Sequence, residues 1–177
     1  MRSDIIEIDN QGSGFDKALE ETRRVAQLQG LNQKDAVRLQ LCTEEMLSLA
    51  RSVTGELRAS FYLEGEGNSF DLHMTTKTVM DKEKRHQLIS ASTSRKNEAA
   101  KSFLGKLRDA FEQAMAAEVD HTYYELPEAV TKDVSYTYMD DPEWDGYEQS
   151  ILRRVADNVK IAIRGGLVDM TVSKSFD

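Results

Sequence analysis

Three polar side chains recur at four-residue intervals within "LCTEEMLSLARSVTGELRASFYL", which covers residues 41–63: Glu44, Ser48 and Ser52. In an α-helix, residues four and eight apart lie on one side, so an acid and two hydroxyls share one stripe. A carboxylate there could act as a general base. Glutamate is also a strong helix former that is common on helix surfaces, and Glu45 directly follows Glu44. A catalytic site and a polar helix edge therefore both fit this stripe.

The other residues with chemical potential show no comparable spacing. His73, His86 and His121 lie far apart in the sequence and do not resemble a zinc-binding pattern. The only cysteine, Cys42, falls on the apolar stripe of the same helical segment, where packing explains it better than nucleophilic chemistry. A single thiol also excludes an intramolecular disulfide framework and suggests a reducing compartment.

Length and charge narrow the class of protein. The chain has 177 residues, which suits one domain with a sizeable core, and a formal net charge of -8. An acidic chain without a basic run would repel phosphates, so no nucleic-acid partner is expected. No apolar run approaches the roughly 20 residues needed to cross a bilayer, and the first residues lack a signal-like apolar segment. We expect a cytoplasmic protein without a membrane partner.

The hydrophobic pattern predicts an α+β fold. Apolar residues follow a three-and-four rhythm in segments that begin at Phe15 and Asn32 and end at Gly30 and Gly55. Strict alternation predicts hairpin strands. The remaining predicted elements are a strand at 5–8, hairpins at 57–74 and 159–172, helices at 81–92 and 96–117, and a short helix in "YEQSILRRVADN". Helices in runs and strands in pairs indicate a two-layer sandwich, with helices on one face of a mixed or antiparallel sheet.

The order of these elements resembles the GHKL superfamily, the ATPase fold of histidine kinases, gyrase and Hsp90-type proteins. Within it, the closest branch is that of the bacterial anti-sigma-factor serine kinases. The resemblance rests on the two helices of "LEETRRVAQLQGLNQKDAVRLQLCTEEMLSLARSV", on the hairpin that follows, and on the closing hairpin "VKIAIRGGLVDMTVSKSF". It covers most of the chain as one GHKL-like domain, residues 1–177, apart from an insertion at about 118–145.

The resemblance implies roles for the stripe. In the family, an acid that activates water or the acceptor hydroxyl is followed four residues later by an asparagine that holds Mg²⁺ on the phosphates of ATP. Glu44 falls on the position of the catalytic acid and Ser48 on that of the metal-binding asparagine. Ser52 stands where the family often has histidine. A serine hydroxyl can touch magnesium but substitutes weakly for an amide oxygen.

The two other family motifs are altered. The aspartate that reads adenine corresponds here to Thr75 or Thr76, with Thr76 taken as the cofactor-binding candidate, and no glycines follow. The glycine-rich lid corresponds to "SRKNEAAKSFLGKLRDAF", where Gly105 echoes the motif and Lys101 could attract phosphates. Lysines on a helix are more often a solvated face. Loss of several positioning groups predicts weak or lost ATP and Mg²⁺ binding.

The insertion is rich in tyrosine and contains Trp144, the only tryptophan. These aromatic rings could cover an edge of the core or contact a protein partner. The resemblance implies a sigma factor or an antagonist-like protein as the partner, and it also allows a homodimer. We therefore predict a regulatory protein that acts by partner binding. The alternatives are an active ATP-dependent serine kinase and a dimerisation module.

Overall fold

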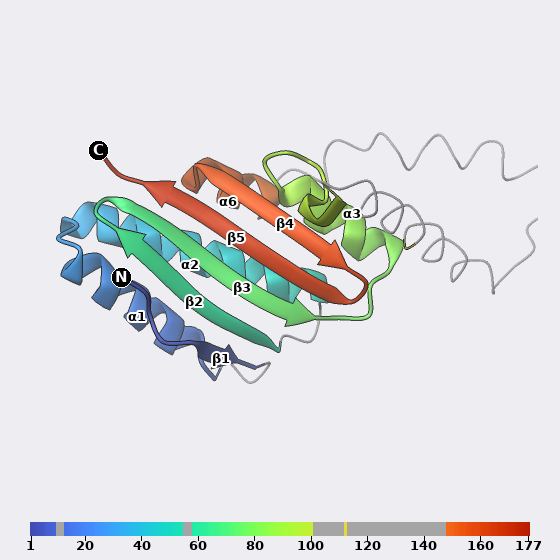
Figure 1. Ribbon diagram of the computed structural model, residues 1–177, viewed down its shortest axis with the longest axis horizontal. Helices are drawn as coiled ribbons and strands as arrows, with labels where there is room; N and C mark the ends of the chain where they lie inside the picture. The colour runs from blue at the N-terminus through green and yellow to red at the C-terminus, as the bar shows by residue number, and fades with distance from the viewer. Residues whose placement is uncertain (10–12, 55–57, 101–111, 113–147) are drawn as a thin grey trace, which may run out of the picture.

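The computed structural model describes residues 1–9, 13–54, 58–100, 112 and 148–177 (Figure 1). The predicted insertion at 118–145 lies outside these residues, as does most of the predicted helix at 96–117, with Lys101 and Gly105. The described elements are, in chain order, β1 (Ile6–Ile8), α1 (Phe15–Leu28), α2 (Gln33–Thr54), β2 (Ala59–Glu66), β3 (Ser69–Lys77), α3 (Lys82–Ala91), η1 (Glu98–Ala100), α6 (Glu148–Val155), β4 (Asn158–Arg164) and β5 (Leu167–Ser175).

The five strands form one sheet in the order β1-β2-β3-β5-β4, and every neighbouring pair is antiparallel. The sheet is therefore antiparallel rather than mixed. Both predicted hairpins are present, as β2–β3 and β4–β5. The last strand of the chain pairs with β3 in the middle of the sheet, so the two hairpins are joined by residues almost a hundred positions apart.

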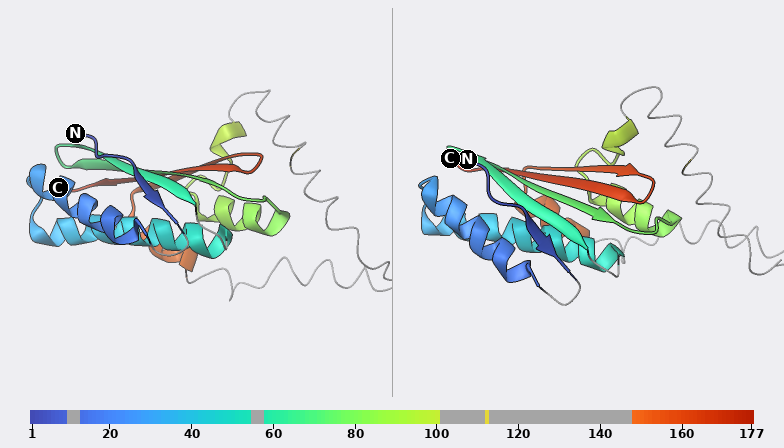
Figure 2. Two further views of the ribbon diagram at one scale, coloured as in Figure 1. Left: turned by 90° about the horizontal axis from the view of Figure 1, so that it is seen from below. Right: turned by 60° about the horizontal axis from the view of Figure 1, so that its bottom comes forward.

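Helices α1, α2, α3 and α6 cover one face of this sheet, as the side views show (Figure 2). Alternate strand residues point into that layer: Phe61 and Leu63 in β2, Leu72 in β3 and Val172 in β5 are all inaccessible to solvent. Period-two alternation therefore builds the sheet side of the core, and the apolar stripes of the helices close it. The α+β architecture, with helices on one face of the sheet, is confirmed at this level.

The helix ends follow from local chemistry. Gly30 follows the last turn of α1 and has φ 81°, a left-handed conformation that glycine adopts without strain. Asn32 then caps α2, because its Oδ1 accepts a hydrogen bond from the Asp35 backbone N–H at 3.0 Å. The predicted stop and the predicted cap are both confirmed. Asp81 caps α3 in the same way, accepting from the backbone N–H of Lys84 at 2.8 Å.

The outer edge of β4 is closed by the segment that follows α3. Thr93 donates its backbone N–H to the Val159 carbonyl, and its Oγ1 accepts from the Val159 N–H, both at 2.8 Å. The amide of Asn97 makes the equivalent pair of hydrogen bonds with Ile163, at 2.8 and 2.9 Å. Side chains thus supply hydrogen bonds that a further strand would otherwise provide at this edge.

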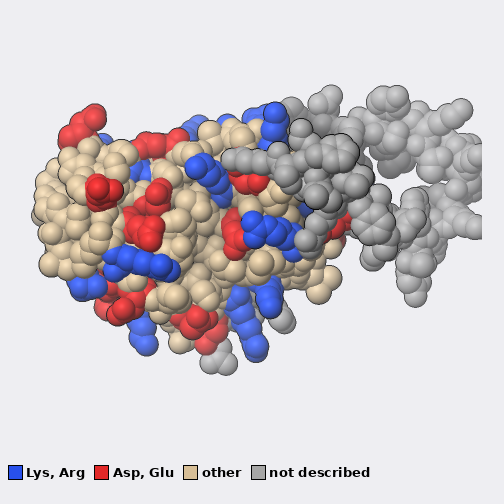
Figure 3. All heavy atoms as spheres, viewed as in Figure 1, with Lys and Arg blue, Asp and Glu red and all other residues tan. Residues whose placement is uncertain are grey.

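The opposite face of the sheet carries no α-helix in the described part of the chain, only the short η1 beside β4 (Figure 2), and it is polar (Figure 3). Acidic and basic side chains are interspersed across it. Tyr62 stacks on His73 with ring centroids 4.6 Å apart, and the guanidinium of Arg2 lies 4.0 Å from the Tyr62 ring centre. Such aromatic and cation–π contacts between neighbouring strands stabilise the sheet on its solvent-facing side.

Candidate functional site

The predicted acid and hydroxyl stripe lies on the solvent-facing side of α2. Glu44, Ser48 and Ser52 are all exposed. The Ser52 hydroxyl donates to the Leu49 carbonyl at 2.9 Å, a back-bond within the helix that satisfies the side chain locally. The structure therefore keeps the three residues on one stripe, as their spacing predicts.

The two threonines at the position of the family's adenine-binding aspartate point to opposite faces of the sheet. Thr76 is the buried one, with 3% of its surface exposed, and its Oγ1 donates to the Arg58 carbonyl at 2.9 Å. Thr75 faces outward and donates to Oδ1 of Asp169 at 2.9 Å. Since each hydroxyl proton already has an acceptor within the protein, neither hydroxyl is free to donate a hydrogen bond to an adenine ring.

A pocket of about 900 Å³ opens at the end of the sheet where β3 leaves it. Its walls come from β1, the start of β2, the end of β3 with residues 78–79, the first turn of α3 and the β4–β5 turn. Thr75 and Thr76 line it, together with the cationic residues Arg58, Lys77 and Lys84. A pocket lined by several positively charged side chains is a candidate ligand site.

The pocket and the α2 stripe are separate places. Glu44, Ser48 and Ser52 are not among the residues that line the pocket, whereas Thr76 is. The described structure thus keeps the three stripe residues on one side of α2 and gives Thr76 to a pocket that none of them lines, and the remaining candidates, Lys101 and Gly105, lie outside the described residues.

The stripe does not provide a set of ligands that fits magnesium. Mg²⁺ demands near-octahedral oxygen coordination and is usually held by carboxylates together with substrate phosphates. Glu44 and Ser48 offer one carboxylate and one hydroxyl on an open helix surface. Within the described ranges, no group of three or more His, Cys, Asp and Glu side chains is arranged to hold a metal ion. The residues of this stripe therefore do not fit a magnesium site by themselves.

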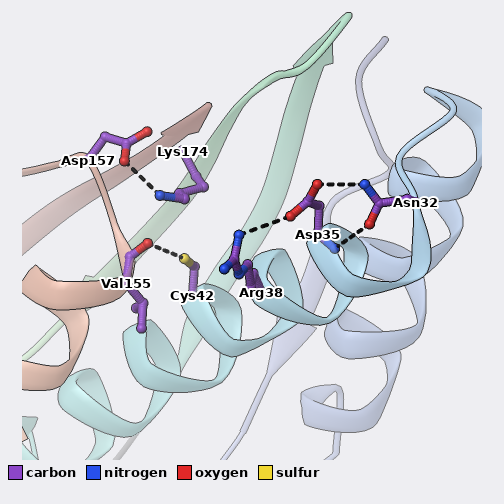
Figure 4. Close-up of polar contacts among 7 residues, drawn as sticks. All are labelled: Asn32, Asp35, Arg38, Cys42, Val155, Asp157 and Lys174. Atoms are coloured by element: carbon purple, nitrogen blue, oxygen red, sulfur yellow. Dashed lines mark hydrogen bonds and ion pairs between the residues drawn. The ribbon is translucent and has the colours of Figure 1, made fainter. Parts of the chain in front are cut away.

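A second polar region lies where α2 meets α6 and the end of β5 (Figure 4). The Cys42 thiol points toward the Val155 carbonyl, with 3.6 Å between sulfur and oxygen. Burial raises the pKa of this thiol to about 11, because the charged thiolate would lose its hydration. Cys42 is thus a packed, neutral side chain, and its interpretation as a core residue is confirmed by its zero exposure.

Asp157 sits at the turn between α6 and β4. Its carboxylate accepts from Nζ of Lys174 and from the Ser175 backbone N–H, each at 2.7 Å. Partial burial opposes ionisation, but these two hydrogen bonds outweigh it and hold the pKa of Asp157 below its ordinary value. The interaction ties the last strand to the end of α6.

The pocket is the feature that reasoning from the sequence missed. Its cations are scattered along the chain, so no local run of charge marks them. The predicted β2–β3 hairpin could have indicated part of it. When the two strands pair about their turn, Arg58 and Lys77 both lie at the end of the hairpin away from that turn.

Comparison of the chain with protein-family models, curated proteins and solved structures finds no match. A search of the described helices for a segment long and apolar enough to span a membrane also finds none.

Proposed function

We propose that this chain is a regulatory protein that acts by binding a protein partner, and that its capacity to bind ATP is weak or lost. The proposal keeps the resemblance to anti-sigma-factor serine kinases as its starting point, with a GHKL-type fold as part of it. The expected partner is a sigma factor or a small antagonist-like protein, and a homodimer is the other assembly that the resemblance allows.

One observation carries the proposal: the described residues expected to contact nucleotide do not line one common pocket. Glu44, Ser48 and Ser52 share an exposed helix stripe, while the buried Thr76 hydroxyl is engaged by the Arg58 carbonyl. Phosphoryl transfer relies almost entirely on positioning and electrostatic stabilisation of the phosphates. Displacing such groups by about 1 Å can cost a hundredfold in rate. A site without a metal-binding amide or a free adenine-reading carboxylate supports binding of a partner better than catalysis.

The nucleotide part is tested by thermal unfolding with and without millimolar Mg-ATP and Mg-ADP. A ligand that binds only the folded state adds about 2.7 kcal/mol of stability at a hundred times its dissociation constant. We expect no rise in the unfolding midpoint. The matched variants are Glu44→Ala, on the stripe, and Glu20→Ala, an exposed glutamate on α1.

A rise in the midpoint that Glu44→Ala removes and Glu20→Ala retains would contradict lost nucleotide binding and favour the active serine kinase, with Glu44 as the base. The partner part is tested by light scattering on the purified chain, alone and mixed with sigma factors and small antagonist proteins encoded in the same genome. A chain that stays monomeric and unbound in every mixture would contradict the proposal.

A further inference from the structure

The pocket at the end of the sheet has a charge opposite to that of the whole chain. Three of its lining side chains, Arg58, Lys77 and Lys84, are cationic, and one, Glu7, is anionic. The chain as a whole carries a formal net charge of -8. A local excess of positive charge within a hollow attracts anions.

Two of these cations stand at the end of the β2–β3 pair, where Arg58 directly precedes β2 and Lys77 is the last residue of β3. The β2–β3 ladder ends with Ala59 opposite Thr76, so the next position sets Arg58 opposite Lys77. Like charges in directly opposed positions on one face destabilise a strand pair. Their juxtaposition costs free energy, and an anion bound between them would turn this repulsion into attraction to the ligand.

The acids nearby are already engaged with other groups. Glu7 Oε1 accepts from the Ser60 hydroxyl at 2.9 Å. The two carboxylate oxygens of Asp169 accept from Thr75 and from Arg164, at 2.9 and 3.4 Å. Within the described part of the chain, neither the Arg58 guanidinium nor the Lys77 ammonium has an ion-pair partner. Both cations are therefore available to a ligand.

Lys84 is the third cation, and its surroundings fix it at the pocket wall. Its Nζ donates to the Val79 carbonyl at 3.2 Å and lies 3.8 Å from Oδ2 of Asp81. The opposite wall is held by the hydrogen bond from the Thr78 N–H to the Gly166 carbonyl, at 2.9 Å. The two strand ends and the start of α3 thus meet around a fixed opening.

We propose that this pocket binds a small anion carrying phosphate or carboxylate groups, held between Arg58 and Lys77 with Lys84 at the rim. The inference goes beyond the proposed function, because it requires neither a nucleotide nor a protein partner and uses none of the stripe residues of α2. The proposal is for a small ligand rather than a polyanion, because only three cations line a pocket of about 900 Å³.

The test is isothermal titration calorimetry of the full chain in magnesium-free buffer, with sodium pyrophosphate and sodium citrate as separate probes at matched ionic strength. The variants are Arg58→Gln and Lys77→Gln, which keep a polar side chain but remove its charge. The control is Lys160→Gln, an exposed lysine on β4 of the same sheet face that does not line the pocket. We expect each pocket variant to weaken binding about tenfold or more, as for loss of one charge-assisted contact, and the control to leave it unchanged.

Unfolding without ligand provides the second readout. Removing one of two opposed cations should leave the unliganded protein as stable as the wild type or more so, although it binds the anion less well. Binding of pyrophosphate alone would identify a phosphate site, and binding of citrate alone would identify a carboxylate site. Binding of both would identify a site that recognises negative charge without distinguishing the two groups. The proposal is overturned if neither probe binds, if the pocket variants bind as the wild type does, or if Lys160→Gln weakens binding equally.

Discussion

At the residue scale, the chemistry of this chain depends on which groups already have partners. The Thr76 hydroxyl donates its hydrogen bond to the Arg58 carbonyl, and the Cys42 thiol is buried and neutral. The spacing of Glu44, Ser48 and Ser52 correctly predicted one shared stripe, because i, i+4 periodicity is a local property of a helix. It did not predict what faces that stripe, because that is decided by packing of distant segments.

The environment of Cys42 makes a prediction about its reactivity. The thiolate is the nucleophile, and a thiol whose pKa is raised to about 11 is almost wholly protonated at pH 8. We expect a disulfide reagent such as DTNB to label native Cys42 only as fast as the protein unfolds, and at once in denaturant. Rapid stoichiometric labelling of the folded chain at pH 8 would contradict a buried, neutral thiol.

The Asp157 carboxylate makes stability depend on acid pH. Because its pKa is lower folded than unfolded, Asp157 stabilises the fold above its unfolded pKa, about 4. That contribution is lost as the pH falls through the lower folded pKa. We expect Asp157→Asn to reduce the difference between the urea midpoints at pH 7 and pH 3. Its side chain is about half exposed, so the effect is modest. A variant with the wild-type pH dependence would argue against the hydrogen bonds to Lys174 and Ser175.

At the element scale, the edge of β4 depends on the side chain of Asn97. Its amide satisfies both the N–H and the carbonyl of Ile163, and the residue is 8% exposed. A buried backbone group left without a partner costs about 1–3 kcal/mol. We therefore expect Asn97→Ala to lower the free energy of unfolding by about 2–4 kcal/mol in urea titrations, and to promote association through the opened strand edge.

The neighbouring Ser94 offers a matched control for this edge. It is exposed, and its hydroxyl donates to the Glu98 carboxylate at 3.1 Å on the protein surface. Ser94→Ala should lower the free energy of unfolding by less than about 0.5 kcal/mol, as is usual for surface substitutions. Equal losses for the two variants would mean that the segment, rather than the Asn97 amide, closes the edge.

The elements themselves were largely predictable, and their arrangement was not. Alternation of Phe61 and Leu63, and of Val168 and Met170, marked both hairpins, because burial of one strand face imposes period two. The pairing of β3 with β5 follows from no local pattern, since it joins two hairpins that are distant in the chain. The pocket shares this limit in part: the local β2–β3 hairpin brings Arg58 and Lys77 to one end of the sheet, but Lys84 and the β4–β5 turn join them only through the packing of distant segments.

At the scale of the whole molecule, the order of the strands makes the C-terminus indispensable. β5 lies between β3 and β4, so the end of the chain contributes to the centre of the sheet. Residues 158–177 carry seven buried apolar side chains, whereas residues 1–9 carry one, Ile8. The seven are Val159, Ile161, Ile163, Val168, Met170, Val172 and Phe176.

The consequence is a difference between two truncations. Each fully buried apolar side chain contributes about 1.5–3 kcal/mol, and a whole domain is stable by only about 5–15 kcal/mol. A chain that ends at Asp157 loses about as much as the entire stability, so we expect no cooperative unfolding transition by circular dichroism. A chain without residues 1–9 loses an edge strand of three residues and one buried side chain. It should unfold cooperatively at a lower urea concentration. Cooperative unfolding of the C-terminal truncation would contradict the central position of β5, because that truncation would then still form a complete sheet and core.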